Sequence, residues 1–264
     1  MSVLEVVDEG RLRTLRLNRP DRKNALNGEL LRALETAVRD AMDDNGVWAI
    51  AITGNGKGFC SGVDVADPTM FTPPKAADGG TADVRDAGYL SKLMRVDCEK
   101  PIIAGINGVA VGAGVAIAMN ADIRIAAPSA RFHPGYARIG VSPDLGLSWT
   151  LPRAIGYERS MRFLLEQRMV AAPELLELGM VSEIVTDDDD LDGRIIEYGT
   201  MLANVAPRAA QHTKRLLARV EAPEELRDHL ALEIELVMQA LQSKDGREAI
   251  RALIAGDQPA FVGE

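Results

Sequence analysis

The chain has few cysteines, few aromatic residues and no long apolar run. Its two cysteines, Cys60 and Cys98, form neither a disulfide framework nor the spacing of a metal site. Two thiols fit a reducing compartment, where each can serve as a small buried apolar residue. No apolar stretch is long enough to cross a bilayer, and the first residues lack a cationic and apolar leader. We therefore expect a cytoplasmic protein with no membrane partner and no metal site.

Positive charge is also scarce. The chain has 30 lysines and arginines against 39 aspartates and glutamates, which gives a net charge of -9 and an isoelectric point near 5.0. This acidic balance argues against a nucleic acid or an anionic membrane as the main partner. With 264 residues, 47% of them hydrophobic, the chain can bury the core of one large domain or of one and a half typical ones.

The stretch PIIAGINGVAVGAGVAIAMNADIR, residues 101–124, is the most informative part of the chain. It predicts a buried strand over 102–106, a small-residue turn over 107–114, a helix over about 115–120 and a second strand. Glycines in the turn let the backbone bend sharply and come close to a ligand. The first unpaired N–H groups of the helix favour negative charge, so this segment can stabilise an oxyanion. Tight packing of the helix on the strand, without a ligand, accounts for the same glycines.

Two nucleotide-binding motifs do not fit the sequence. GAGVAI approaches the G-x-G-x-x-G pattern, but Ile117 replaces the third glycine. Phe132 stands where an acidic residue should follow about 20 positions later. The glycine-rich run GNGKGFCSG, residues 54–62, lacks the ending and the spacing of a P-loop. A nucleotide site is therefore not expected at either place.

Strand and helix patterns alternate in the first part of the chain. Residues 3–18 have the pattern of a hairpin, a helix with an apolar residue at every fourth position follows Asn27, and 47–53 reads as a strand. The loop between hairpin and helix gathers Arg19, Arg22 and Lys23, which suits a solvated loop or contact with a phosphate.

Residues 67–83 have no periodicity and are rich in proline, glycine, alanine and aspartate. They predict a mobile insertion near the site, followed by a helix over about 82–96. Further on, the pattern predicts turns over 132–136 and 141–146, a helix with Trp149 and Leu151, and a short helix before Gly179. A strand over 180–185 and an acidic loop over 187–190 follow, and the pattern is helical from Leu191 onward.

Four segments taken together, in this order, resemble the crotonase superfamily, the enoyl-CoA hydratase/isomerase group of acyl-CoA enzymes. They are NRPDRKNALN, TGNGKGFCSGVDV, KPIIAGINGVAVGAGVAIAMNADIRIAA and the strand that begins LGMV. The resemblance implies an α/β fold, a spiral of ββα units over residues 1–205, with a helical region over 206–264 that forms trimers, commonly paired into hexamers. It also implies an acyl-CoA thioester substrate, with coenzyme A as part of that substrate and no permanently bound cofactor.

The resemblance assigns site residues by position. The two oxyanion-hole amides of the family fall on Val63 and on Ala113, and two amides on a thioester oxygen favour an enolate. Coenzyme A in the family lies along the loops that match residues 22–26 and 61–66. The resemblance thus implies substrate-binding positions at Lys23, Ala25, Ser61, Asp64, Val65 and Ala66 on these loops, and at Gly112 and Gly114 on each side of Ala113.

The residues at two family positions disfavour hydration. Hydratases of the family carry two glutamates where this chain has Ala116 and Tyr136. Alanine cannot transfer a proton, and a phenol is a poor base at neutral pH. Asp144, in Ser-Pro-Asp-Leu-Gly, matches the place where isomerases and a dehalogenase of the family have a catalytic aspartate. The segment IGVSPDLGLSWTLPRAIG looks most like the ring-opening isomerases of phenylacetate catabolism and the dienoyl-CoA isomerases.

We therefore expect an acyl-CoA isomerase in which Asp144 moves the proton. Leu145, Leu147 and Trp149 should raise the pKa of Asp144 if they line the pocket. Alternatively, Asp144 is a turn residue or the N-cap of the following helix.

Two further positions and two further functions stay open. His133 is either a packed loop residue or a second base, and Tyr136 either donates a hydrogen bond to the acyl group or fills the pocket. The other functions are an enoyl-CoA hydratase with relocated catalytic groups and a non-catalytic acyl-CoA-binding member.

Overall fold

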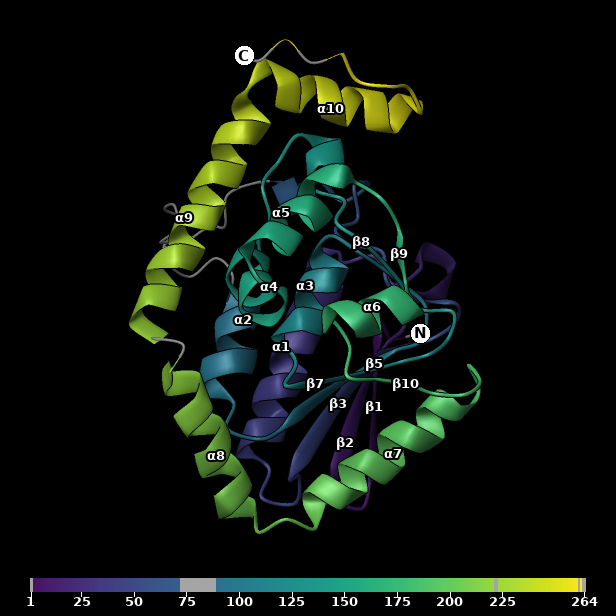
Figure 1. Ribbon diagram of the computed structural model, residues 1–264, viewed down its shortest axis with the longest axis vertical. Coiled ribbons are helices and arrows are strands. Elements are labelled where there is room, and N and C mark those ends of the chain that lie inside the picture. Colours follow the sequence, from purple (N-terminus) through teal and green to yellow (C-terminus); the bar gives the residue numbers. More distant parts are fainter. Residues whose placement is uncertain (1, 72–88, 221–222, 261, 263–264) are drawn as a thin grey trace.

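The computed structural model describes residues 2–71, 89–220, 223–260 and 262. Strands and helices alternate over most of the chain, which ends in helices (Figure 1). The first half contains β1 (Leu4–Glu9), β2 (Leu12–Leu17), η1 (Pro20–Arg22), α1 (Gly28–Asp43), β3 (Ala49–Gly54), β4 (Gly58–Cys60), η2 (Pro68–Phe71), α2 (Tyr89–Lys92), η4 (Leu93–Asp97), β5 (Ile102–Ile106), β6 (Val109–Val111), α3 (Ala113–Asn120), β7 (Ile123–Ala126) and β8 (Arg131–His133). The second half contains η5 (Ala137–Ile139), α4 (Leu147–Ile155), α5 (Tyr157–Glu166), β9 (Val170–Ala171), α6 (Ala172–Leu178), β10 (Glu183–Ile184), α7 (Asp190–Ala203), α8 (Pro207–Val220), α9 (Pro223–Gln242) and α10 (Lys244–Ala255).

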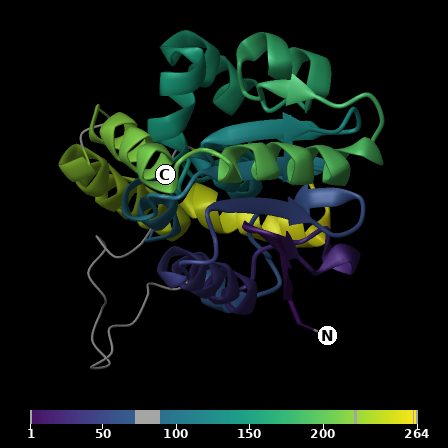
Figure 2. The ribbon, with the colours of Figure 1, turned by 90° about the horizontal axis from the view of Figure 1, so that it is seen from below.

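The larger sheet has six strands in the order β1-β2-β3-β5-β7-β10. Only β1 and β2 pair antiparallel, as the predicted hairpin, and the remaining neighbours are parallel. Helices cover both faces, with α1 on one side and α7 on the other (Figure 2). Successive residues of β3 alternate between the faces: Ile50 and Ile52 pack with α1, while Ala49 and Ala51 pack with α7. Every residue of β3 is buried, as parallel strands require.

The smaller sheet, in the order β4-β6-β8-β9, contains a strand where the sequence predicted a turn. The prediction of one turn over 107–114 is wrong, because Val109–Val111 forms β6 between β4 and β8. The following helix, α3, begins at Ala113 rather than near 115, and all its residues are buried. Val109 and Val111 favour a strand individually, but three residues between glycines are too few for a periodic strand signal, and their pairing partners lie far away in the chain. The predicted strand over 180–185 is likewise shorter, since β10 is only Glu183–Ile184.

Several local predictions are confirmed. The Asn27 side chain caps α1 by accepting a 2.9 Å hydrogen bond from Leu30 N–H, and α6 ends at Gly179 with φ 82°. Of the insertion predicted over 67–83, Pro68–Phe71 is a 3-10 turn, and residues 72–83 lie outside the described residues. The first part of the helix predicted over 82–96 also lies outside them, while residues 89–97 are helical.

The C-terminal helices extend from the sheet to the opposite end of the molecule. α7 covers the larger sheet, α8 follows, and α9 leads past α4 to α10 (Figure 1). α10 returns over η5, so the last two helices reach the end of the smaller sheet. Within the described part of the chain, no helix combines the length and the apolar character that a membrane span needs.

Candidate active site

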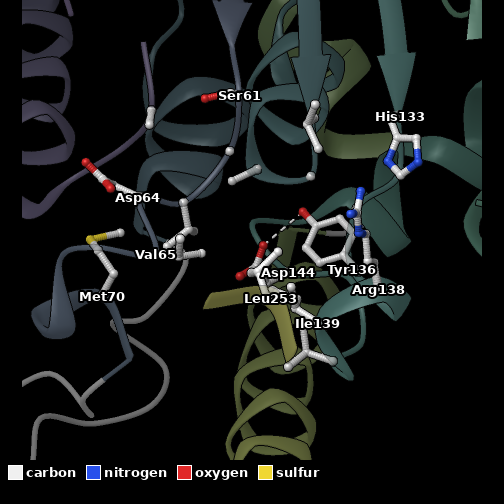
Figure 3. Close-up of a pocket in the computed structure, with 18 of the residues that line it drawn as sticks. Ser61, Asp64, Val65, Met70, His133, Tyr136, Arg138, Ile139, Asp144 and Leu253 are labelled. Carbon is white, nitrogen blue, oxygen red and sulfur yellow. Dashed lines mark hydrogen bonds between the residues drawn. The ribbon is translucent and has the colours of Figure 1, made fainter. Parts of the chain in front are cut away.

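A cavity of about 430 Å³ lies where the ends of the smaller sheet meet α9 and α10 (Figure 3). One wall consists of the main chain around residues 61–65 and 111–113. The turn around η5 and the residues leading to Asp144 form the opposite wall. The apolar lining includes Val65, Met70, Ile139, Val141, Leu241 and Leu253. The cavity thus combines an aliphatic interior with main-chain amides at one wall, which suits an apolar acyl group attached to a polar carbonyl.

The glycines on each side of the cavity bring β4 and the start of α3 into backbone contact. A Cβ atom on Gly62, which has φ 88°, would lie 2.7 Å from the carbonyl oxygen of Val111. A Cβ atom on Gly114 would overlap the carbonyl oxygen of Cys60. Without side chains at these two positions, Val63 and Ala113 line the same cavity.

The N–H groups of Val63 and Ala113 are suited to a carbonyl ligand. Val63 forms a parallel bridge with Leu26 in which the flanking groups, Gly62 C=O and Asp64 N–H, make the hydrogen bonds. Ala113 is the first residue of α3, where N–H groups have no partner within the helix. Among the described residues, neither of these two N–H groups donates a hydrogen bond within the chain. Two such donors in one cavity can stabilise an oxyanion.

Asp144 lines the cavity on the side opposite residues 61–65 (Figure 3). The Tyr136 hydroxyl donates a 3.0 Å hydrogen bond to its Oδ1 atom. Burial raises the pKa of Asp144 to about 7, the hydrogen bond from Tyr136 opposes this shift, and the negative charge of Glu233 adds to it. A carboxyl group with a pKa near neutrality can both remove and return a proton at physiological pH.

Tyr136 stays protonated beside this carboxyl group. Burial, followed by the nearby charge of Asp144, raises the pKa of the phenol well above its usual value. The phenol is therefore a hydrogen-bond donor and not a base. Of the two roles left open for Tyr136, the structure fits pocket filling, and its hydroxyl is directed to Asp144 (Figure 3).

One expectation about the surroundings of Asp144 is wrong. Leu145, Leu147 and Trp149 do not line the cavity. Leu147 packs in the main core and Trp149 packs with Leu226 and Leu230, because α4 turns these side chains away from the cavity. The aliphatic lining comes instead from residues that include Val237, Leu241 and Leu253 of α9 and α10.

The alternative interpretation of Asp144 as the helix N-cap is also wrong. The N-cap of α4 is Gly146, and the Asp144 carboxyl group accepts its hydrogen bond from Tyr136. Only the main-chain oxygen of Asp144 takes part in the turn, where it accepts a 3.0 Å hydrogen bond from Leu147 N–H. The Asp144 side chain therefore does not cap α4 and lines the cavity instead.

Most of the expected substrate-binding positions meet at the cavity. Ala25, Ser61, Asp64, Val65, Gly112, His133 and Tyr136 line it, together with Val63, Ala113 and Asp144. Three expected positions, Lys23, Ala66 and Gly114, do not line it, and Gly114 is buried against β4. The small size of Gly114 therefore serves the packing of α3 on β4.

Three polar side chains at the cavity have partners within the chain. Asp64 pairs with Arg19 over 2.8 Å, and the Ser61 hydroxyl donates to the Arg22 carbonyl over 3.1 Å. His133 Nε2 lies 3.0 Å from the main-chain oxygen of Gln167, to which it donates. This leaves Nδ1 as the only nitrogen of His133 that can accept a proton.

Sequence reasoning missed the contribution of the C-terminal helices. Val237, Leu241 and Leu253 belong to amphipathic helices, and an amphipathic pattern alone does not distinguish a cavity lining from a core or a subunit contact. Arg138 also lines the cavity and was not singled out.

Comparison with known proteins identifies the family to which the chain belongs. The model of the enoyl-CoA hydratase/isomerase family matches residues 9–264. The chain belongs to this family, within the crotonase superfamily. It is 33% identical to the 1,2-epoxyphenylacetyl-CoA isomerase of Escherichia coli K12, over 99% of this chain and 98% of the relative. It is 34% identical to a probable enoyl-CoA hydratase of Rhodobacter capsulatus, over 97% of this chain and 96% of that protein.

The structure matches a solved member of the same family. The enoyl-CoA hydratase/isomerase of Pseudoalteromonas atlantica T6c superposes with a TM-score of 0.88 at 29% identity, over 98% of this chain and 100% of the other. The predicted α/β crotonase fold is therefore confirmed. The family is one of enzymes, and its name covers both isomerases and hydratases, as do the names of the two relatives.

Proposed function

We propose that this enzyme is an acyl-CoA isomerase that shifts a double bond, with Asp144 as its acid/base. The observation that supports this most strongly is that Asp144, with a pKa of about 7, lines the same cavity as Val63 and Ala113, whose N–H groups have no partner in the described part of the chain. The substrate is an acyl-CoA thioester with an isolated double bond, and coenzyme A enters as part of it.

The chemistry needs one group that removes a proton and returns it. The thioester oxygen accepts hydrogen bonds from the two main-chain N–H groups while the Asp144 carboxylate takes a proton from C2 of a 3-enoyl-CoA. The C–H electron pair becomes part of a dienolate whose negative charge lies on the thioester oxygen. Asp144 then returns the proton to C4, which gives the conjugated 2-enoyl-CoA.

The cavity supports isomerisation better than hydration. Addition of water needs one group to activate the water and another to protonate carbon. Besides Asp144, the acidic side chain in the described lining is Asp64, and its hydrogen bond and ion pair with Arg19 lower its pKa despite partial burial. Ala116, at one of the hydratase glutamate positions, is fully buried. The Escherichia coli relative is itself named an isomerase, of 1,2-epoxyphenylacetyl-CoA.

A hydratase remains the second candidate, because the Rhodobacter capsulatus relative is named a probable enoyl-CoA hydratase. Incubation with a 3-enoyl-CoA in deuterated water separates the candidates. The proposal expects the absorbance of the conjugated thioester to rise, with deuterium at C4 in those turnovers in which the proton on Asp144 exchanges with solvent before its return. Loss of that absorbance from a 2-enoyl-CoA would show hydration instead. Binding of the acyl-CoA with neither change would show a protein that binds without catalysis.

The proposal includes the assembly that the family resemblance implies. We expect residues 206–264 to hold a homotrimer or a hexamer of two trimers. Leu216 and Leu217 on α8 are 66% and 65% exposed in the single chain, which leaves apolar surface for such a contact. Light scattering coupled to size-exclusion chromatography measures the assembly mass, and a monomer would contradict this expectation.

A further inference from the structure

Glu233 of α9 is a buried carboxylate that caps a helix other than its own. Its side chain is 5% exposed and accepts hydrogen bonds from the first turn of α4. Gly146 N–H donates to Oε2 over 2.8 Å, and Ser148 N–H donates to Oε1 over 3.2 Å. The Ser148 hydroxyl also donates to Oε1. Since no side chain of the N-cap residue caps α4, Glu233 supplies the cap from the C-terminal helices.

The turn that leads into α4 has a conformation that needs such support. Leu145 has φ 48° and the next residue has φ 72°, so two successive residues are left-handed. For a leucine this costs about 1 kcal/mol or more. The Leu145 carbonyl accepts hydrogen bonds from Asn120 Nδ2, over 2.8 Å, and from the Ser91 hydroxyl. These contacts and the cap from Glu233 hold the turn from three helices. Asp144 comes immediately before it, so the turn determines where its carboxyl group points.

Glu233 also changes the electrostatic surroundings of Asp144. Unpaired N–H groups at a helix N-terminus attract a nearby carboxylate and favour its ionised form. Glu233 occupies those of Gly146 and Ser148, and the Asp144 side chain bonds to Tyr136 on the cavity side. The negative charge of Glu233 further opposes ionisation of Asp144, next to the larger effect of burial.

We propose that Glu233 is a positioning residue for Asp144, which holds the left-handed turn and keeps the N-terminal amides of α4 away from the Asp144 carboxyl group. The inference rests on the proposed function, in which Asp144 is the acid/base. It assigns α9 a part in proton transfer, in addition to lining the cavity.

Other charged and titratable groups also lie around Asp144 and Glu233. They are Tyr136, Arg138 and His133 on the near wall, Arg22 and Asp64 on the opposite wall, and His229 beside Glu233. His229 Nε2 lies 2.6 Å from the Ser148 hydroxyl and 3.5 Å from Glu233 Oε1.

The test compares Glu233→Gln with Glu235→Gln in the full-length protein. Glutamine keeps one acceptor for the Gly146 N–H but removes the charge, whereas Glu235 is exposed on the same helix and bonds only to Gln239 in the described structure. The protein is labelled with 13C at the aspartate carboxyl groups and titrated by NMR. The Asp144→Asn variant identifies the Asp144 resonance. The pH profile of kcat/KM for isomerisation of a 3-enoyl-CoA is measured in parallel.

We expect the titration midpoint of Asp144 and the acid limb of kcat/KM to move down by about half a pH unit or more in Glu233→Gln. The Glu235→Gln variant should match the wild type in both measurements. An unchanged Asp144 midpoint in Glu233→Gln would overturn the inference, even if kcat fell. If Asp144→Asn kept its isomerase activity, the proposed function itself would fail. Loss of activity in Asp144→Asn, with an unchanged midpoint in Glu233→Gln, would refute only the inference.

Discussion

The Tyr136 hydroxyl lies 3.0 Å from Oδ1 of Asp144, and the two residues approach the cavity from opposite ends of one connection. η5 and the loop after it return the chain, so two residues eight positions apart meet in the cavity that Val63 and Ala113 also line. Burial raises the pKa of Asp144 and this hydrogen bond lowers it, which gives a value of about 7. The hydrogen bond thus helps to set the pKa of Asp144 near neutral pH.

Removal of the Tyr136 hydroxyl should move the pH profile in the opposite direction from removal of Glu233. In Tyr136→Phe, the Asp144 carboxylate loses a hydrogen bond that stabilises its ionised form, so its pKa rises above about 7. The acid limb of kcat/KM should move up by about half a pH unit or more. Tyr157→Phe is the control, because Tyr157 is 76% exposed. A downward shift in Tyr136→Phe would contradict the assigned role of the hydrogen bond.

Replacement of Asp144 by asparagine should stabilise the protein at high pH. The folded-state pKa of about 7 lies above the ordinary value of 3.8, so protonation of Asp144 favours the folded state. This contribution is complete below the ordinary value and is lost as pH rises through about 7. At pH 8 we expect the free energy of unfolding of Asp144→Asn to exceed that of the wild type by about 1–3 kcal/mol. Near pH 4 the difference between the two proteins should be smaller. Urea unfolding at both pH values measures this, and a larger difference at pH 4 would show that the sign is wrong.

A methyl group at Gly114 should damage the oxyanion site without touching an acid or a base. The added Cβ would overlap the Cys60 carbonyl oxygen, so Gly114→Ala forces α3 away from β4. The amides of Val63 and Ala113 then separate, and we expect kcat to fall about 100-fold or more. Gly193→Ala is the matched control, because nothing lies within 4 Å of a Cβ there, and it should add about 0.5–1 kcal/mol of stability in α7. Full activity of a folded Gly114→Ala protein would contradict the assigned oxyanion site.

Local patterns in the sequence were sufficient to predict several strands and helices. The hairpin, α1 with its Asn27 cap, and the buried strand β5 follow from periodicity and turn residues. The three-residue strand β6 could not be predicted in this way, because it exists only through pairing with β4 and β8. Its two valines favour a strand, but a run of three residues gives no periodic signal, so the pairing partners decide the outcome.

The residues of the candidate site also fall into those that the sequence could predict and those that it could not. Val63, Ala113 and Asp144 could be named from segments that keep the order of the family, and the structure brings them to one cavity. The hydrogen bond from Ser148 to Glu233 joins residues 85 positions apart, and no periodicity indicates such a pair. The direction of Leu147 away from the cavity likewise depends on the left-handed turn before α4.

The most direct test of the proposed function is the isomerisation rate of Asp144→Asn with a 3-enoyl-CoA. Asparagine has nearly the same shape as aspartate and can still accept the Tyr136 hydrogen bond, but it cannot take up a proton from carbon. We predict that kcat falls about 1000-fold or more, while the dissociation constant of a saturated acyl-CoA changes less than about threefold. A variant that binds the saturated acyl-CoA as the wild type does and still isomerises the substrate at a comparable rate would contradict the assignment of Asp144.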